Sequence, residues 1–254
     1  MEQTLHICRA PCSPFNPDLP PIELIVEHYQ ATTESRQQEI DHCLRLNAAN
    51  PLIDRIHLMT EHPVDLAALG VDGAAVRQVE RAERLTFAAG FDYVQASIAA
   101  GTICIVANAD IRFDDTLALL KVQDMRGRAF ALLRYEYLKD GGLELHGTNH
   151  RAPTYHPNIL RGGSQDAWIF AAPLPPRRNR ADFYVGGVHL CDSKINWILH
   201  DAGLEVTNPC YSLRAIHHHQ SQVRNTRRDF RCSEPPFHCP SPCHLPVRWE
   251  LLRP

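Results

Sequence analysis

The sequence predicts an α/β fold: one Rossmann-type domain in which helices flank a mixed, mostly parallel central sheet. Three observations support this prediction. Short apolar, β-branched runs alternate with polar segments of helical spacing. The runs are apolar throughout, which is typical of strands covered on both faces. The 254 residues are 44% hydrophobic and 22% charged, which is the composition of a globular domain with a sizeable core.

The first half of the domain opens with a predicted βαβ unit. Residues 22–29 form the first strand, residues 34–47 a helix and residues 53–61 the second strand. Such an opening indicates two parallel strands joined by a right-handed crossover. The Ala-rich residues 74–99 are predicted to be mostly helical.

The second half alternates elements with a long polar stretch. We expect strands at 103–107, 129–137 and 204–208 and helices at 115–123 and 193–202. Periodicity fades between residues 141 and 180, where Gly, Pro, His and Arg dominate. This stretch is therefore predicted to be a loop-rich insertion of the kind that carries function.

The two ends of the chain differ in composition from the middle. Residues 1–21 are rich in proline and are predicted to form an irregular arm, whereas residues 22–224 form the domain. Residues 225–254 form a Pro- and Cys-rich tail, and its Cys and His residues leave a zinc site open as an alternative to an irregular segment.

Bulk properties favour a cytoplasmic protein. The net charge of −3 does not indicate binding to nucleic acid or to a membrane surface. The first residues lack the pattern of a signal peptide, and no apolar run approaches the roughly 18–20 residues of a membrane span. The nine cysteines are expected to be reduced thiols, with Cys43, Cys104 and Cys191 as small buried residues.

The clearest functional motif is TICIVANADIRFDD at residues 102–115. Its apolar run stops at Asn108, Ala109 and Asp110, which indicates a buried strand with a carboxylate at its carboxyl end. Ligands of open α/β sheets bind just beyond this end. Asp110 is therefore a candidate ligand for a divalent cation that carries a phosphorylated molecule. The alternative is a strand followed by an ordinary Asx-turn.

Two further clusters suit the same chemistry. Asp192 directly precedes a predicted helix, where it is either an N-cap or a catalytic carboxylate. His217, His218 and His219 are consecutive and form either a surface loop or a source of imidazole ligands. An imidazole beside the Asp110 carboxylate would suit Mn²⁺ or Mg²⁺, with a diphosphate completing the coordination shell.

Residues 162–168 (GGSQDAW) combine paired glycines, an acid and an aromatic ring. Asp166 is the lone acid in the arginine-rich residues 151–180, so its neighbours favour the ionised form. Trp168 either stacks on a sugar ring or fills the core, and the adjacent Ile169 and Phe170 favour the core.

The order of these motifs resembles that of nucleotide-diphospho-sugar glycosyltransferases with the GT-A fold. The pattern is ANADIxFDD, RYE, SQDAW, CDxxI, NP and HxHxS, and the resemblance covers about residues 22–224. Such enzymes begin with a nucleotide-binding βαβ half, here residues 22–61, and carry a DxD-type motif at a strand end. In this chain Asn108 replaces the first acid of that motif.

The resemblance implies a role for each matching residue. Asp110 would ligate the metal, together with His219 or His217. Asp192 would be the base that deprotonates the acceptor hydroxyl in an inverting reaction, and Asp166 competes for that role. The donor would contact Glu27, His28, Tyr29, Arg84, Asn108, Ala109, Asp110 and Arg224.

The implied activity is metal-dependent transfer of a sugar from a nucleotide-diphosphate donor to an acceptor hydroxyl. A cation, Mn²⁺ or Mg²⁺, would hold the leaving diphosphate, and a carboxylate would accept the acceptor's proton. Two alternatives stay open. A sugar nucleotidyltransferase would carry a Gly-rich loop after the first strand, whereas residues 29–33 contain no glycine. A degenerate GT-A scaffold would bind a sugar nucleotide or a partner without turnover.

Overall fold

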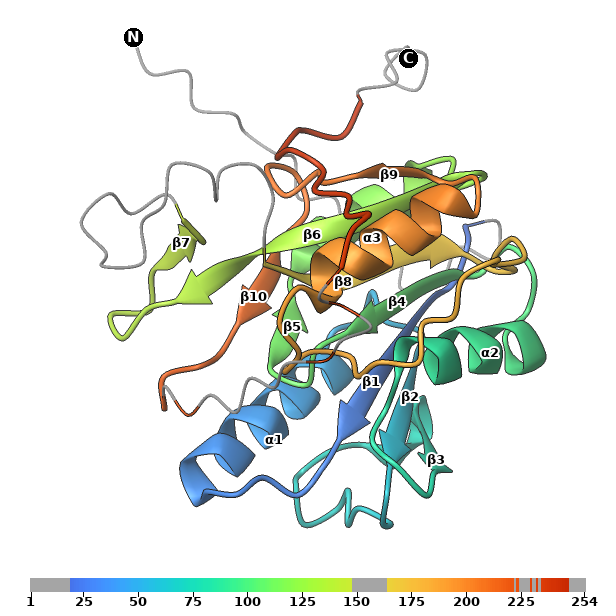
Figure 1. The fold of residues 1–254 in the computed structure, drawn as a ribbon. Helices are drawn as coiled ribbons and strands as arrows, with labels where there is room; N and C mark the ends of the chain where they lie inside the picture. Colours follow the sequence, from blue (N-terminus) through green and yellow to red (C-terminus); the bar gives the residue numbers. More distant parts are fainter. Residues whose placement is uncertain are drawn as a thin grey trace, which may run out of the picture.

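The computed structural model describes residues 19–147, 164–221, 223, 229, 232 and 234–246. Its strands form one ten-stranded sheet with the order β3-β2-β1-β4-β8-β6-β10-β5, and β7 and β9 also pair with β6 (Figure 1). Five strand pairs are parallel and four are antiparallel. The prediction of an α/β domain with a mixed, mostly parallel sheet is therefore confirmed. The arm predicted for residues 1–21 lies almost entirely outside the described residues.

The first half contains the predicted βαβ unit. Its elements are β1 (Ile22–His28), α1 (Glu34–Ala48), β2 (Arg55–Thr60), η1 (Gly73–Ala75), β3 (Val76–Glu80), α2 (Phe87–Ser97) and β4 (Ile103–Ala107). Strand β1 pairs in parallel with β2 and with β4, so that Ile25 lies opposite both His57 and Val106. Parallel neighbours need a crossover connection, and α1 supplies it between β1 and β2.

Helix α1 is fixed at both of its ends. The hydroxyl of Thr33 accepts a hydrogen bond from the backbone N–H of Arg36 at 3.3 Å and so caps the helix. Near the other end, the buried Asn47 amide donates to the carbonyl of Ile111 at 2.9 Å and accepts from the N–H of Phe113 at 3.0 Å. These bonds hold α1 against β5, the strand that follows the motif at residues 108–110.

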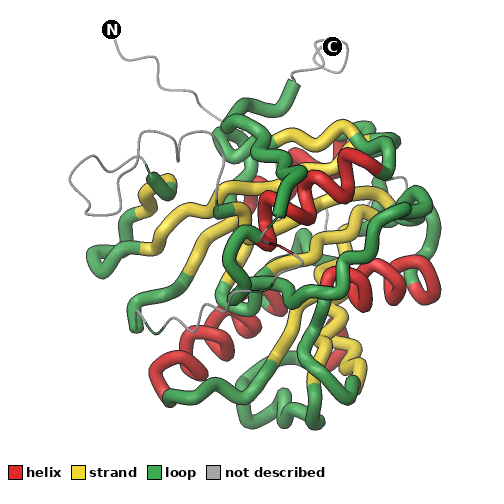
Figure 2. The backbone as a smooth tube through the Cα atoms, in the orientation of Figure 1, coloured by secondary structure: helices red, strands yellow, loops and turns green. Residues whose placement is uncertain are grey.

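The second half is built around β6. Its elements are β5 (Ile111–Phe113), the 3-10 helix η2 (Asp115–Val122), β6 (Arg128–Tyr137), β7 (Leu143–Leu145), β8 (Gln165–Ala171), α3 (Cys191–Asp201), β9 (Glu205–Thr207) and β10 (Ala215–His217). Strand β6 pairs with β7, β8, β9 and β10. Long loops join these elements, as the tube in Figure 2 shows.

Five strands were not predicted: β3, β5, β7, β8 and β10. Residues 74–99, predicted to be mostly helical, contain strand β3 ahead of α2. Strand β3 pairs with β2 at the sheet edge, and its polar sequence VRQVE lacks the apolar run that marks a buried strand. The predicted loop-rich stretch contains β8, which lies between β4 and β6. Strands β8 and β10 owe their conformation to long-range ladders, which local periodicity does not record.

Helices cover both faces of the sheet (Figure 1). On β1, Ile25 packs with Phe87 and Phe91 of α2, whereas the preceding Leu24 packs on the opposite face with Leu44 of α1. Successive strand residues point to opposite faces, so each strand contributes to two cores. No helix in the described part of the chain is both long enough and apolar enough to span a membrane.

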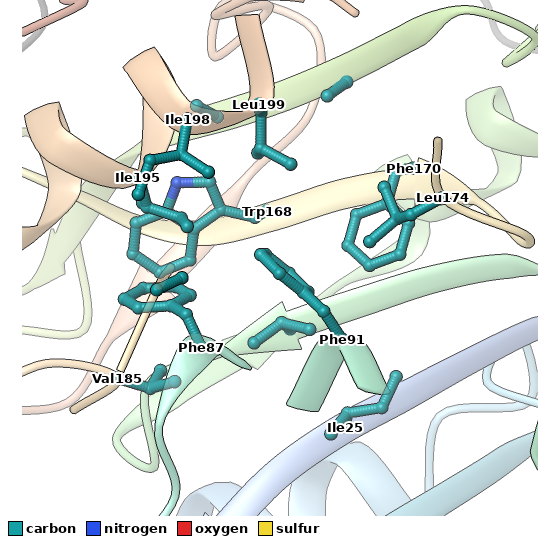
Figure 3. Close-up of a cluster of buried hydrophobic side chains, with 14 of the residues drawn as sticks. Ile25, Phe87, Phe91, Trp168, Phe170, Leu174, Val185, Ile195, Ile198 and Leu199 are labelled. Carbon is teal, nitrogen blue, oxygen red and sulfur yellow. The ribbon is translucent and has the colours of Figure 1, made fainter. Parts of the chain in front are cut away.

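Trp168 is a core residue, as its apolar neighbours predict. It packs between α2 and α3 (Figure 3), with its ring edge-on to Phe87 at a centroid distance of 4.7 Å. Its indole N–H donates to the Oδ1 of Asn196 at 2.8 Å, which satisfies the one polar atom of the buried ring.

None of the described cysteines forms a disulfide. Cys43, Cys104 and Cys191 are buried, as predicted. In the C-terminal segment, Cys232 packs into the core beside α2 and α3, and the N–H of Cys243 donates to the carbonyl of Asn208 at 2.8 Å. Among the described residues of this segment, no Cys and His side chains gather closely enough to share a zinc ion.

Candidate active site

Four strands end at the same edge of the sheet. Strands β1 and β4 are parallel, β8 is antiparallel to both β4 and β6, and β10 is parallel to β6. The carboxyl ends of β1, β4, β6 and β10 therefore meet the amino end of β8. Ligands of α/β sheets bind at such an edge, where side chains from several strands converge.

A cavity of about 360 Å³ lies at this edge, within the roughly 300–1,000 Å³ of small-molecule sites. Charged side chains make up much of its wall. They are the acids Glu27, Asp110 and Asp166 and the arginines Arg36, Arg84 and Arg134. A wall with both signs of charge suits a polar, ionised ligand better than an apolar one.

Asp110 forms the centre of a buried charge cluster at one end of the cavity. Its Oδ2 accepts hydrogen bonds from Arg36 Nη2 at 2.7 Å and from His217 Nε2 at 2.9 Å. The Nδ1 of His219 lies 3.8 Å from the same oxygen. Burial alone would raise the pKa of Asp110, but His217 and Arg36 hold that pKa well below its usual range.

His217 lies between two carboxylates. Its Nε2 donates to Asp110, and its Nδ1 donates to the Oε2 of Glu136 at 2.7 Å. Burial by itself would lower the pKa of His217, but Asp110 and Glu136 raise it to about 9. Glu136 also accepts from Arg134 Nε at 2.7 Å, so the imidazole is oriented by a carboxylate that is itself held in place.

The residues fit a divalent cation. Asp110, His217 and His219 each offer one ligand atom, and these atoms lie within 4.8 Å of one another. One carboxylate oxygen and two imidazole nitrogens form a mixed donor set of the kind that binds Mn²⁺. Glu136 supplies the outer-shell carboxylate that commonly orients a ligating histidine.

Asn108 connects this cluster to Asp166. Its Nδ2 donates to the Oδ1 of Asp166 at 2.5 Å, and its backbone N–H donates to the Asp166 carbonyl at 3.0 Å. Arg134 Nη1 donates to the other Asp166 oxygen at 2.8 Å. The buried Oδ1 of Asn108 has no hydrogen-bond partner among the described residues.

Gly186 approaches Asn108 closely. Its φ of +73° lies in the left-handed region, and a Cβ at this position would come within 2.8 Å of Asn108 Oδ1. Only glycine meets both requirements without moving the Asn108 amide. Gly186 therefore fixes where that amide can lie.

A second part of the cavity wall is built around Glu27. Its Oε1 accepts from Arg84 Nε at 2.6 Å and from the backbone N–H of Leu85 at 2.7 Å. The Arg84 guanidinium lies over the Tyr29 ring, 3.7 Å from its centroid. A carboxylate, a cation and an aromatic face together suit a flat ring with hydrogen-bond donors.

Asp192 lies at the second residue of α3. The N-cap position is taken by Leu190, with a φ of 64° and no side-chain capping bond. The Asp192 carboxylate accepts from the backbone N–H groups of Ser164 at 2.6 Å and Ser193 at 2.9 Å. Burial raises the pKa of Asp192. Asp192 is not part of the cavity wall, which Asp166 does line.

Known structures resemble the fold, although no family model and no curated protein matches the chain. Mannosyltransferase PcManGT from Pyrobaculum calidifontis, in complex with GDP-Man and Mn²⁺, matches 80% of this chain with 16% identity and a TM-score of 0.50. This chain spans 58% of the length of that structure. The fold is GT-A-like.

Two further structures match with lower TM-scores. TarS from S. aureus in complex with UDP-GlcNAc has a TM-score of 0.45 and 10% identity, over 80% of this chain and 61% of its own. A 4-diphosphocytidyl-2C-methyl-D-erythritol synthase from Anaerococcus prevotii has a TM-score of 0.43 and 13% identity, over 82% of this chain and 91% of its own.

Most of the predicted site residues meet in the cavity of the GT-A-like fold. The cavity wall includes Glu27, Tyr29, Arg84, Asn108, Ala109, Asp110, Asp166, His217 and His219. His28 is not part of this wall, and its Nε2 lies 2.8 Å from Asp41 Oδ1, beside α1. Arg224 lies outside the described residues.

Three residues of the GT-A-like site carry no role in the sequence analysis. Arg134 and Glu136 belong to the RYE segment of β6, whose position in the motif order is the one signal that marks them. Arg36 reaches Asp110 from α1, and its sequence context is that of an ordinary polar helix face.

Proposed function

We propose that this chain is a glycosyltransferase that uses a nucleotide-diphospho-sugar donor and a divalent cation. One observation carries the proposal: a group of metal-ligand type and a ring-binding end share one cavity at the carboxyl ends of the strands. The ligand group is Asp110, His217 and His219, and the other end is formed by Glu27, Tyr29 and Arg84. The GT-A-like fold supports this proposal, and so does the similar mannosyltransferase structure with GDP-Man and Mn²⁺.

The two ends of the cavity divide the donor between them. Tyr29, Arg84 and Glu27 would hold the nucleoside, because they offer a ring face and polar partners. Asn108, which also lines the cavity, would contact the ribose or the sugar. A molecule that bridges both ends places its diphosphate beside Asp110.

Asp110, His217 and His219 would hold the cation, Mn²⁺ or Mg²⁺. When bound, this ion would stabilise the negative charge that develops on the leaving diphosphate. Glu136 keeps the His217 ring oriented toward Asp110, with 2.7 Å between Nδ1 and Oε2. Arg134 supports Glu136 and Asp166 together, so it links the cation end to the sugar side of the cavity.

Asp192 and Asp166 are our two candidates for the general base of an inverting reaction, and Asp166 is the one that lines the cavity. Both oxygens of Asp166 accept hydrogen bonds, from Asn108 and from the Arg134 guanidinium. The bonds of Asp192 are to backbone N–H groups, and burial raises its pKa. A raised pKa makes a carboxylate a better proton acceptor near neutral pH.

The first test is a thermal-shift panel of UDP-, GDP-, dTDP- and CMP-linked sugars, each with Mn²⁺ and with EDTA. A donor at a hundred times its Kd stabilises the folded state by about 2.7 kcal/mol. We expect one donor class to raise Tm, and EDTA to abolish the rise. Absence of a shift with every donor overturns the proposal.

Product analysis with the stabilising donor tests the reaction itself. We expect release of the nucleoside diphosphate, by transfer to an added acceptor or slow hydrolysis. Formation of a nucleoside triphosphate and a sugar 1-phosphate when pyrophosphate is added to the donor would identify a sugar nucleotidyltransferase instead. Donor binding with no product under any condition would identify a scaffold without turnover.

The base assignment is tested by paired substitutions. Asp192→Asn should leave the donor-induced Tm shift intact and lower the transfer rate by about 10²–10⁴-fold, the usual contribution of a general base. Asp166→Asn should disturb donor binding as well, because it releases Asn108 and Arg134. If Asp166→Asn lowers the transfer rate and leaves the donor-induced Tm shift intact, whereas Asp192→Asn does not, Asp166 is the base.

A further inference from the structure

Arg36 occupies the centre of the proposed cation site. Its Nη2 donates to Asp110 Oδ2 at 2.7 Å, and its Nη1 donates to His219 Nδ1 at 2.7 Å. One guanidinium therefore bridges two of the three side chains that we propose as metal ligands. Arg36 also lines the cavity, so the same group faces the space that a donor would fill.

The Arg36–Asp110 pair is largely removed from water. The Arg36 side chain is 14% exposed and that of Asp110 is 6% exposed. Charges in such surroundings interact more strongly than charges on the surface. A divalent cation at Asp110 would lie against this guanidinium, and the two would repel each other. They would also compete for the lone pairs of one carboxylate.

Helix α1 holds Arg36 in this position. Nη1 also donates to Glu39 Oε2 at 3.0 Å, one helical turn further along α1. Glu39 in turn accepts from the backbone N–H of Ser221 at 2.6 Å and from its hydroxyl at 3.0 Å. The segment that follows β10 and carries His219 is thus tied to the same helix turn as Arg36.

We propose that Arg36 is a built-in counter-cation of Asp110 that a divalent cation must displace, and that the donor diphosphate receives the displaced guanidinium. The inference rests on the proposed function, because it takes the Asp110 group as the cation site. A guanidinium forms strong paired hydrogen bonds with phosphate oxygens, so the diphosphate offers Arg36 a partner to replace Asp110.

Coupled binding follows from this exchange. Without a diphosphate, Mn²⁺ binding must break the Arg36–Asp110 pair and leave the guanidinium without that partner. With a diphosphate present, the displaced Arg36 guanidinium gains phosphate oxygens as partners in place of Asp110. Mn²⁺ and diphosphate should therefore raise each other's affinity, and by linkage both effects are equal in size.

The test measures Mn²⁺ binding to the full chain by calorimetry, with and without inorganic pyrophosphate. In wild type we expect pyrophosphate to raise Mn²⁺ affinity about 5- to 150-fold, the usual range of such coupling. Arg36→Met should raise the affinity for Mn²⁺ alone about tenfold or more and remove most of the coupling. Circular dichroism confirms that each variant is folded, and Arg36→Lys retains a cation for comparison.

Arg84→Met is the matched control, because Arg84 lines the same cavity but pairs with Glu27. It removes the same charge and should leave the affinity for Mn²⁺ alone nearly unchanged. If Arg36→Met and wild type bind Mn²⁺ equally, and Asp110→Asn abolishes binding, the counter-cation role is overturned and the cation site stands. If neither protein binds Mn²⁺, with or without pyrophosphate, the cation site of the proposed function falls as well.

Discussion

Two parts of the cavity wall each contain an Arg–carboxylate ion pair, and the two pairs differ in their neighbours. Arg36 lies 2.7 Å from Asp110 at one end, and Arg84 lies 2.6 Å from Glu27 at the other. The Asp110 pair adds two imidazoles from β10 and its following segment. The Glu27 pair adds a backbone N–H and the ring of Tyr29.

This difference shows that an Arg–carboxylate pair has no function of its own. Imidazole nitrogens around Asp110 would complete a ligand set for a divalent ion. An aromatic face beside Glu27 completes a seat for a flat ring. The neighbours that the fold brings to each pair therefore distinguish the proposed cation end from the proposed nucleoside end.

The largest effect is expected for Asp110, and it should distinguish this carboxylate from Glu27. Asp110→Asn should lower the transfer rate by about 10²–10³-fold, the loss typical when one stabilising partner of a developing charge is removed. It should also abolish the effect of EDTA on donor binding. Glu27→Gln should weaken donor binding while EDTA keeps its effect.

The control for this comparison is Asp115→Asn, in the same motif but 92% exposed and paired with Arg214. It should behave as wild type in both assays. Equal loss of EDTA sensitivity in Asp110→Asn and Glu27→Gln would erase the distinction between the two ends.

An intermediate effect is expected for Glu136, whose carboxylate is hydrogen-bonded to His217. Glu136→Gln removes the charge that orients His217 and should lower Mn²⁺ affinity about 10- to 100-fold, as outer-shell changes do. Glu144→Gln is a matched control, because Glu144 lies opposite Glu136 in the β6–β7 pair. Calorimetry with Mn²⁺ checks both variants, and unchanged affinity in Glu136→Gln would contradict the outer-shell role.

The smallest effect lies at the nucleoside end. Tyr29→Leu removes the ring beneath Arg84 and should weaken donor binding by about 1 kcal/mol, the size of an exposed cation–π contact. Tyr29→Phe keeps the ring and should bind as wild type does. Mn²⁺ affinity should not change in either variant; a change would show that the two ends are not independent.

The local pattern of apolar residues predicted strand β4 but not strand β8. The apolar run before Asn108 and Asp110 indicates a buried strand, and strand β4 lies there with its carboxyl end at the cavity. Strand β8 carries an equally apolar stretch, but Gly, Pro and Arg residues surround it and its partners are distant in sequence. Its direction, which brings Asp166 to the cavity, follows from pairing with β4 and β6.

Arg36 shows most clearly what the sequence does not reveal. It lies 74 residues before Asp110, on a helix whose polar positions are all compatible with solvent exposure. Its role depends on the packing of α1 against β5, which the Asn47 side chain fixes through two backbone hydrogen bonds. No spacing within α1 encodes that contact.

Gly186 limits which substitutions can be used to change the donor preference of the proposed site. A library that varies this position would mostly sample proteins in which the Asn108 amide has been pushed aside, since a Cβ there comes within 2.8 Å of it. Tyr184 and Val185 line the same cavity, and neither has a positive φ. Directed evolution of the donor site should therefore keep Gly186 constant and search its two predecessors.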